Sequence, residues 1–125
     1  MPAPSNTDRE MLKSGPARKV TIYVNEDTAS QKDYLHHEVF AFLLDHEVAG
    51  ATLIRPEAGF GSHHRAHSTH AFGAGGLHLP VRVEFIESVE RVAELLPLLS
   101  DLVRDGIIEV QETTIWKAGY VEAKV

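Results

Sequence analysis

Several short runs of the chain alternate apolar and polar side chains, which is the pattern of a half-buried β-strand. The first is VTIYV at residues 20–24, followed by ATLIR at 51–55 and LPVRVEFIE at 79–87. A fourth run, IIEVQETTIW at 107–116, is rich in β-branched residues, which favour strands. The pattern therefore predicts four strands, the first of them beginning near Lys19.

A helix is predicted between the first two strands, because apolar residues recur there at helical spacing: Leu35, Val39, Phe42 and Leu43. Ser30 is the expected N-cap, with Asp33 three residues later as in a capping box. Gly50 is the expected left-handed residue at the end of this helix. These signals place the helix between Ser30 and Gly50.

A second helix is predicted after the third strand, with an apolar face formed by Val92, Leu95, Leu96, Leu99, Leu102 and Val103. Ser88 is its expected N-cap, and Gly106 is expected to end it. Pro97 predicts a kink, because a proline removes one backbone hydrogen bond inside the helix.

The predicted order is β-α-β, a long loop and then β-α-β, which is the ferredoxin-like, split-βαβ arrangement. We expect an α+β domain over residues 18–125, in which both helices cover one face of an antiparallel four-stranded sheet. Residues 1–17 are expected to form a disordered N-terminal tail. The uncovered face includes Ile54, Ile86 and Ile107 among polar residues, which predicts contact with another subunit.

The loop between the second and third predicted strands runs over residues 57–78 and shows no hydrophobic period. Its segment GFGSHHRAHSTHAFGAGG, residues 59–76, contains five glycines and four of the eight histidines. Loops of this length in a compact domain are usually functional or disordered. The composition is compatible with a metal site, an anion-binding loop or a mobile arm that contacts a partner.

Composition excludes several classes of function. The chain has no cysteine, so disulfides, thiolate zinc sites and cysteine nucleophiles are excluded. A net charge of −6 argues against a broad nucleic-acid surface or an anionic-membrane surface. The polar start MPAPSNTDREMLKSGPA is neither a secretory signal nor a membrane-spanning segment, so we expect a cytoplasmic protein without direct membrane insertion.

Two stretches of the chain are similar to a known family: AGATLIRPEAGFGSHHRAHSTHAF and LPVRVEFIESVERVAELLPLLSDLVRDGIIEVQETTI. They resemble the PII-like bacterial family catalogued as domain of unknown function 190, which is related in fold to the PII nitrogen-regulatory signal transducers. The resemblance covers about residues 18–115. Its most specific pieces are the AGAT strand entry, Arg55 followed by Gly59-Phe60-Gly61, the Arg65-x-His67 step, Leu79-Pro80 and the helical LPLL.

The resemblance implies a ferredoxin-like homotrimer in which the loop at 57–78 corresponds to the PII T-loop. By analogy, this loop docks on a membrane transporter or an enzyme, and adenine nucleotides bind in clefts between subunits. The chain departs from the PII pattern at VRDGIIEV, residues 103–110, which lacks the lysine of the PII phosphate loop. The long loop also lacks a tyrosine, the residue that is nucleotidylated in some PII proteins.

The root of the long loop is the candidate site for a small anionic effector, an adenine nucleotide among the possibilities. Glycines around an aromatic allow close backbone approach to an anion, and arginine forks hold phosphate or carboxylate. The candidate residues here are Arg55, Gly59, Phe60, Gly61 and Arg65. After the last strand, Trp116 can stack on a base with Lys117 near its phosphate. In the alternative interpretation, Phe60 packs under the loop, the arginines pair with acidic residues and the tail packs on a neighbouring subunit.

The histidines of the loop have two interpretations. With Ser62, they form the predicted contact surface for the partner protein: His63, His64, His67 and His70. The same residues also suggest a metal-binding trimer similar to the CutA family. On a helical turn His63, His67 and His70 share one face, a spacing that can chelate Zn or another divalent transition metal. One His67 from each of three subunits, near a threefold axis, is a second possible metal site.

The sequence contains no nucleophile elbow, Walker-type loop or placed carboxylate pair, so we predict that the protein is not an enzyme. The histidines of the first predicted helix, His36, His37 and His46, are predicted to be exposed helix residues without a function. The favoured hypothesis is a regulatory protein that binds a small anionic effector and presents the loop to a partner.

Overall fold

The computed structural model describes residues 11–30, 33–60, 67–68 and 79–121. Within these residues the chain forms two helices, one four-stranded sheet and one short pair of strands. In chain order the elements are β1 (Gly15–Asn25), α1 (Leu35–Asp45), β2 (Thr52–Ile54), β3 (Ala58–Gly59), β4 (His67–Ser68), β5 (Pro80–Ser88), α2 (Val89–Leu102) and β6 (Ile107–Ile115).

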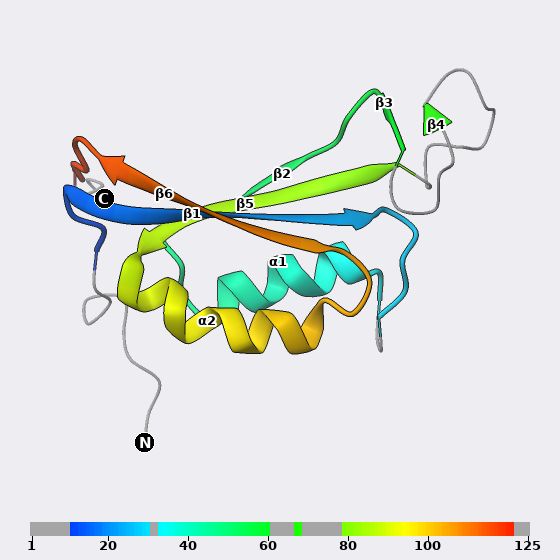
Figure 1. The fold of residues 1–125 in the computed structure, drawn as a ribbon, viewed down its shortest axis with the longest axis horizontal. Helices are drawn as coiled ribbons and strands as arrows, with labels where there is room; N and C mark the ends of the chain where they lie inside the picture. Colours follow the sequence, from blue (N-terminus) through cyan, green and yellow to red (C-terminus); the bar gives the residue numbers. More distant parts are fainter. Residues whose placement is uncertain (1–10, 31–32, 61–66, 69–78, 122–125) are drawn as a thin grey trace.

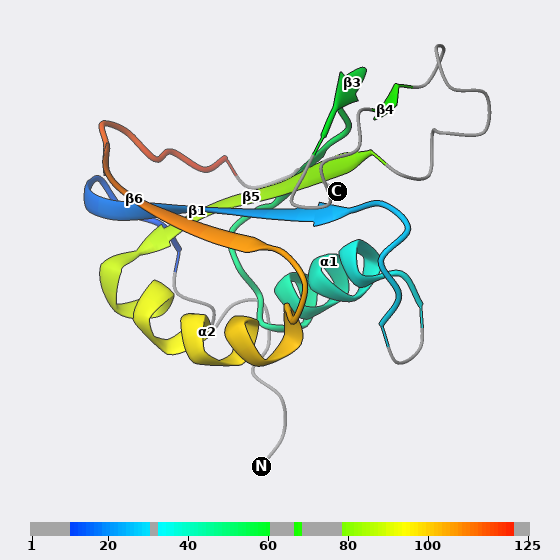
Figure 2. The same ribbon diagram turned by 45° about the vertical axis from the view of Figure 1, so that its right-hand side comes forward.

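The main sheet is antiparallel and has the strand order β2-β5-β1-β6. Its central strand β1 pairs with β5 over residues 17–25 and with β6 over residues 15–23. Both helices lie on the same face of this sheet, as two views of the ribbon show (Figure 1, Figure 2). This topology confirms the predicted α+β, ferredoxin-like fold.

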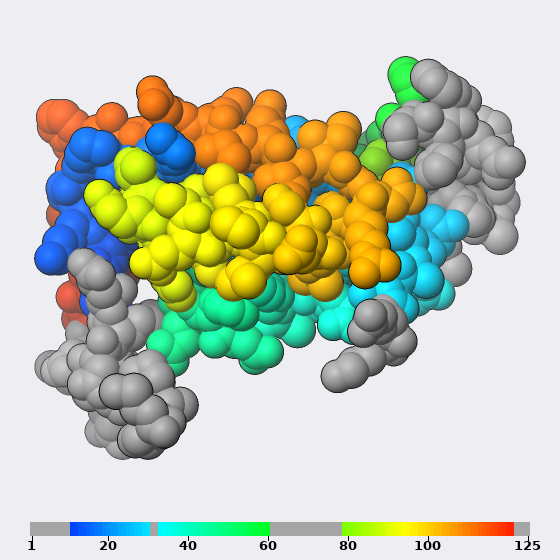
Figure 3. Space-filling view, turned by 60° about the horizontal axis from the view of Figure 1, so that its bottom comes forward, coloured from blue at the N-terminus to red at the C-terminus, as the bar shows by residue number. Residues whose placement is uncertain are grey.

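The core lies between the sheet and the two helices. Alternate residues of β1 and β5 point into it, and the period-two pattern of the sequence matches burial throughout β5 and at Val20, Ile22 and Val24 of β1. The core side chains that are almost fully buried come from both strands and helices, and they include Val20, Ile22, Val39, Leu43, Val81, Val83, Val92, Leu95 and Leu99. Figure 3 shows the outer face of the helix layer, with α1 and α2 lying side by side.

The first strand begins at Gly15, earlier than the alternating pattern predicts. Glycine and proline are poor signals of a strand interior, so the sequence predicts that Gly15, Pro16 and Ala17 belong to the tail. The pairing with β5 ends at Ala17, so Gly15 and Pro16 pair with β6 alone. A proline is tolerated at such a one-sided position, because the strand has a neighbour on only one side there.

The predicted start of α1 is wrong. The N-cap residue is Tyr34, which makes no side-chain capping hydrogen bond, and the helix begins at Leu35. Ser30 instead donates its backbone N–H to the carbonyl of Asp33 at 2.7 Å. The Asp33 carboxylate accepts from the Tyr34 backbone N–H at 2.7 Å, so the predicted capping pair forms a turn ahead of the helix.

The predicted end of α1 at Gly50 is also wrong, because the helix ends at Asp45 and the left-handed residue is Glu47, with φ 56°. The Glu47 N–H donates to the carbonyl of Leu44 at 3.1 Å, and the Val48 N–H donates to that of Leu43 at 3.2 Å. These two bonds form a Schellman motif. Glycine is the usual residue at this position, so the sequence pointed to the wrong residue.

The start of α2 confirms the prediction, since the Ser88 hydroxyl accepts the Arg91 N–H at 3.2 Å. The helix continues through Pro97 to Leu102, so the predicted ending at Gly106 is wrong by several residues. Gly106 has a different role. A Cβ at this position would lie 2.5 Å from the carbonyl oxygen of Tyr23, so only glycine lets β6 begin this close to β1.

Candidate functional site

The long loop at 57–78 contains regular structure at its base. Ala58 pairs with Ser68 and Gly59 pairs with His67, which makes β3 and β4 a short antiparallel pair. The expectation of a loop without secondary structure is therefore wrong at this point. The other predicted loop residues lie outside the described part of the chain: Gly61, Ser62, His63, His64, Arg65 and His70.

Arg55 lies directly after β2, where the chain leaves the sheet to form the long loop. Its Nη1 forms an ion pair with Oε1 of Glu26, whose side chain is only 5% exposed. Glu26 follows β1, and its backbone N–H donates to the carbonyl of Leu79 at 2.8 Å. One residue thus connects both ends of the loop: Glu26 binds Arg55 on the outgoing side and Leu79 on the returning side.

The energetics of this contact depend on burial. An exposed ion pair contributes at most about 1 kcal/mol, whereas a buried carboxylate left without its partner is costly. Glu26 is almost fully buried and Arg55 is half exposed. An anion from solvent can therefore reach the Arg55 guanidinium. The buried Glu26 carboxylate, in turn, needs that guanidinium to compensate its charge.

Gly59 and Phe60 follow in the same segment. A Cβ on Gly59 would lie 3.2 Å from Cγ of Pro80, so glycine allows β3 to run close to the first residue of β5. The side chain of Phe60 is 69% exposed. An exposed aromatic side chain is available to a ligand or to another protein chain.

Trp116 and Lys117 follow β6, which ends at the opposite end of the sheet from the point where β2 leads into Arg55 (Figure 1). Ile54 pairs with Arg82, and Tyr23 pairs with both Arg82 and Ile107, so β6 begins at the Arg55 end. Ile115 lies eight residue steps along the strand from Ile107, a distance of about 27 Å. The two groups of predicted ligand residues therefore do not form one site within a single chain.

The uncovered face of the sheet carries the three isoleucines that the sequence placed there. Ile54, Ile86 and Ile107 alternate in register with the helix-facing residues, so all three lie on this face. Ile86 and Ile107 are exposed. Charged residues accompany them, with Nζ of Lys19 at 3.5 Å from Oε2 of Glu84. The face therefore combines apolar and paired charged side chains.

His36 does not match its prediction, because its side chain is buried, with 2% exposure, rather than exposed. Both ring nitrogens lack a hydrogen-bond partner among the residues described. Burial lowers the pKa of His36, and the nearby His37 lowers it further, while Asp33 opposes the shift. Burial and the nearby His37 therefore both favour the neutral form of the His36 ring.

The neighbours of His36 form a small polar cluster at the start of α1. Nδ1 of His37 lies 3.0 Å from Oδ2 of Asp33, and the His37 side chain is half exposed as predicted. The Tyr34 backbone N–H, and next to it the His37 ring, hold the pKa of Asp33 below its ordinary value. The rings of His36 and His37 are 4.1 Å apart, centroid to centroid.

His46 caps the other end of α1 instead of extending freely into solvent. Its Nδ1 lies 2.8 Å from the carbonyl oxygen of Phe42, and its ring stacks on that of Phe42 at 4.0 Å. Arg91 of α2 donates to the His46 carbonyl. These contacts give His46 a structural role, since they connect the end of α1 to the start of α2.

The described residues show neither a metal-binding cluster nor a membrane-spanning helix. No group of three or more histidine, aspartate or glutamate side chains there is arranged to hold a metal ion. Of the four loop histidines, only the backbone of His67 is described, in β4. No helix in the same ranges combines the length and the apolar character needed to cross a membrane.

A family model supports the resemblance found in the sequence. The model of DUF190, described as "Uncharacterized ACR", matches residues 17–115. This range contains every strand and helix from β1 to β6 except the first two residues of β1.

Solved structures with the same fold are PII-like. CPII, a nitrogen regulatory PII-like protein from Thiomonas intermedia K12 bound to ADP, AMP and bicarbonate, is 21% identical, with a TM-score of 0.59 over 82% of this chain and 90% of that chain. A candidate PII-like signalling protein from Thermus thermophilus is 20% identical, with a TM-score of 0.56 over 83% of this chain and 93% of that chain. CPII bound to ADP, AMP and acetate is also 20% identical, with a TM-score of 0.54 over 83% and 92%. At these identities the likeness establishes the fold.

Proposed function

Because the chain belongs to the DUF190 family and has a PII-like fold, we propose that it is a non-enzymatic regulatory protein of the PII-like type. In this proposal, a cytoplasmic homotrimer binds a small anionic effector in the clefts between subunits, and an adenine nucleotide is the first candidate. The segment at 57–78 then contacts a partner protein, either a membrane transporter or an enzyme.

The observation that carries the proposal is the ion pair between Arg55 and the buried Glu26 at the root of this segment. An anionic effector that binds Arg55 competes with Glu26 for the same guanidinium. Since Glu26 also holds Leu79 through its backbone, the competition acts where the segment leaves and re-enters the sheet. Effector binding would in this way replace the contact between Arg55 and Glu26 and change the position of the segment at 57–78. A ligand that binds one arrangement of a segment better than another shifts the equilibrium between them.

The proposed trimer explains two further features. The uncovered face of the sheet, with Ile86 and Ile107 exposed, is available for contact with other subunits. Trp116 is 92% exposed, and within one chain it is about a sheet length away from Arg55. In a trimer, Trp116 and Lys117 of one subunit can approach Arg55 of another. ADP and AMP are bound in CPII, which makes them the first effectors to test.

Two variants with opposite expected effects test the proposal. Arg55→Ala removes the guanidinium, so ADP and AMP affinity should fall about tenfold or more, the equivalent of one charge-assisted hydrogen bond. Glu26→Gln removes the competing charge and keeps the size of the side chain, so affinity should stay equal or rise. Isothermal titration calorimetry measures both.

The double variant Arg55→Ala, Arg65→Ala extends the test to the second predicted arginine. Full nucleotide affinity in this variant would show that the root of the segment is not the effector site. Lys13→Ala is the matched control, because Lys13 is an exposed cation ahead of β1 and should not affect binding.

A further inference from the structure

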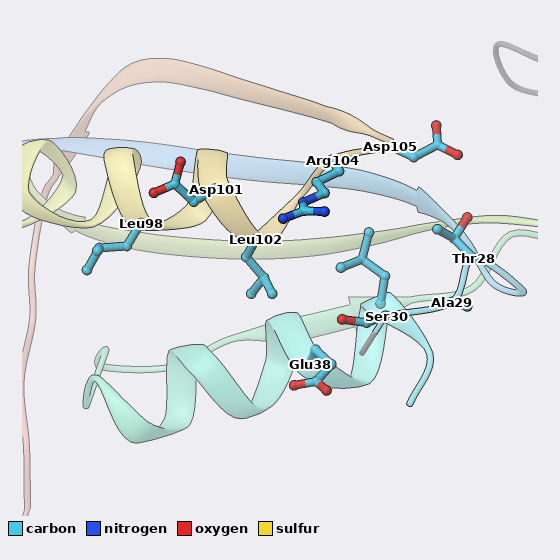
Figure 4. Close-up of a pocket in the computed structure, with 10 residues that line it drawn as sticks. Thr28, Ala29, Ser30, Glu38, Leu98, Asp101, Leu102, Arg104 and Asp105 are labelled. Atoms are coloured by element: carbon cyan, nitrogen blue, oxygen red, sulfur yellow. The ribbon is translucent and has the colours of Figure 1, made fainter. Parts of the chain in front are cut away.

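A cavity of about 630 Å³ lies between the first half of α1 and the last turns of α2. It opens on the helix side of the molecule, away from the uncovered face of the sheet (Figure 4). Three chain segments form it: residues 28–30 ahead of α1, the first turns of α1, and the end of α2 with the residues that follow. Its volume is in the range of small-molecule sites in proteins.

The floor of the cavity is apolar. Leu35 of α1 is buried, and Leu102 of α2 is partly buried against the core. Leu98, one turn earlier in α2, is 47% exposed at the rim. This floor can take a short hydrocarbon chain but would gain nothing from contact with a bare ion.

Side chains of opposite charge line the two sides of the cavity. The side chain of Arg104 extends from the end of α2 toward the cavity, and Glu38 lies on the α1 side (Figure 4). Neither side chain makes an ion pair or a side-chain hydrogen bond with another residue in the described part of the chain. By contrast, Arg55 and Arg91 both have partners, Glu26 and Glu94. Arg104 and Glu38 are therefore both available to a ligand.

The charge balance of the lining limits the class of ligand. The carboxylates of Glu38 and Asp101 outnumber the single guanidinium of Arg104 among these lining residues, so the lining carries an acidic excess. This excess repels a nucleoside di- or triphosphate, and the guanidinium disfavours a simple amine. A molecule that carries one group of each sign complements both walls.

We propose that this cavity is a second ligand site, independent of the root of the loop, and that it binds a small zwitterion of the amino-acid class. The carboxylate of the ligand pairs with the Arg104 fork, its ammonium group pairs with Glu38, and its hydrocarbon part lies on Leu35 and Leu102. Because the site lies on the helix side, it stays accessible in an oligomer formed through the uncovered sheet face.

The test is a binding screen of the full chain against the twenty α-amino acids and γ-aminobutyrate at millimolar concentration, read by thermal shift and then by calorimetry. At least one of these zwitterions should bind saturably. Arg104→Ala and Glu38→Gln should each weaken that binding at least tenfold. Glu90→Gln is the matched control, because Glu90 is an exposed acid in the first turn of α2, away from the cavity.

Methyl NMR locates the ligand: the resonances of Leu35 and Leu102 should shift, and those of Val110 should not. The proposal is overturned if no zwitterion binds, if binding survives both variants, or if acetate or methylamine alone binds equally well. It is also overturned if the only ligands that bind are nucleotides. Circular dichroism checks that both variants are folded, which their positions at the surface of the helix layer favour.

Discussion

Replacement of Gly106 by alanine tests the packing at the junction between α2 and β6. The added Cβ would lie 2.5 Å from the Tyr23 carbonyl oxygen, 2.9 Å from Cγ1 of Val24 and 3.0 Å from Cγ1 of Val103. The first of these atoms belongs to the backbone of the central strand, so it cannot move without disturbing the sheet. The alanine must therefore push β6 away from β1.

The expected cost follows from these contacts. Overpacking of a well-packed site by a methyl group costs about 1–3 kcal/mol. The replacement also gains about 0.4–1 kcal/mol, because alanine restricts the unfolded chain more than glycine does. The net loss for Gly106→Ala is then about 1–2 kcal/mol, which lowers the melting temperature by roughly 4–10 °C in a domain of this size.

The assay is thermal and urea unfolding followed by circular dichroism, at one fixed protein concentration. Gly50→Ala is the matched control, since a Cβ there meets no atom within 4 Å, and it should be neutral or slightly stabilising. A Gly106→Ala variant as stable as the Gly50→Ala control would refute the close approach of β6 to β1.

Three further predictions concern single residues. Glu47→Gly should stabilise the protein by up to about 1 kcal/mol in urea unfolding, because glycine adopts the left-handed φ of 56° without strain. His36→Leu should flatten the pH dependence of stability. The lowered pKa of His36 means that stability is complete above the unfolded-state value of about 6.5 and is lost as the pH falls below it. An unchanged slope between pH 7.5 and 5 would contradict this. Ile86→Asp should dissociate the proposed oligomer in size-exclusion chromatography, whereas Leu44→Asp, on the exposed side of α1, should not.

The strands and the layer order were predictable, because alternation in β1 and β5 coincides with burial on the helix side. The helix boundaries were less so. Ser30 and Gly50 have the residue types that favour caps, yet the contacts of Tyr34 and Glu47 decide where α1 begins and ends. Local propensity is weak compared with tertiary packing, so a glutamate can hold the left-handed position when Leu43 and Val48 are buried on either side.

The candidate site shows the same limit. Arg55 was identified from the sequence, but its partner Glu26 is distant along the chain, and only the fold brings the two together. The burial of His36 could not be predicted either, since a histidine in the first turn of a helix is usually exposed. Arg104 could not be identified from the sequence, because its position over a cavity depends on how α1 packs beside α2.

Native mass spectrometry of the purified protein with ADP and AMP tests the central claim most directly. The account predicts a trimer that takes up to three nucleotides, one for each cleft between subunits, with occupancy reduced in the Arg55→Ala variant. A monomer, or a trimer that binds no nucleotide under the same conditions, would contradict the proposed effector site and leave the PII-like relationship as one of fold alone.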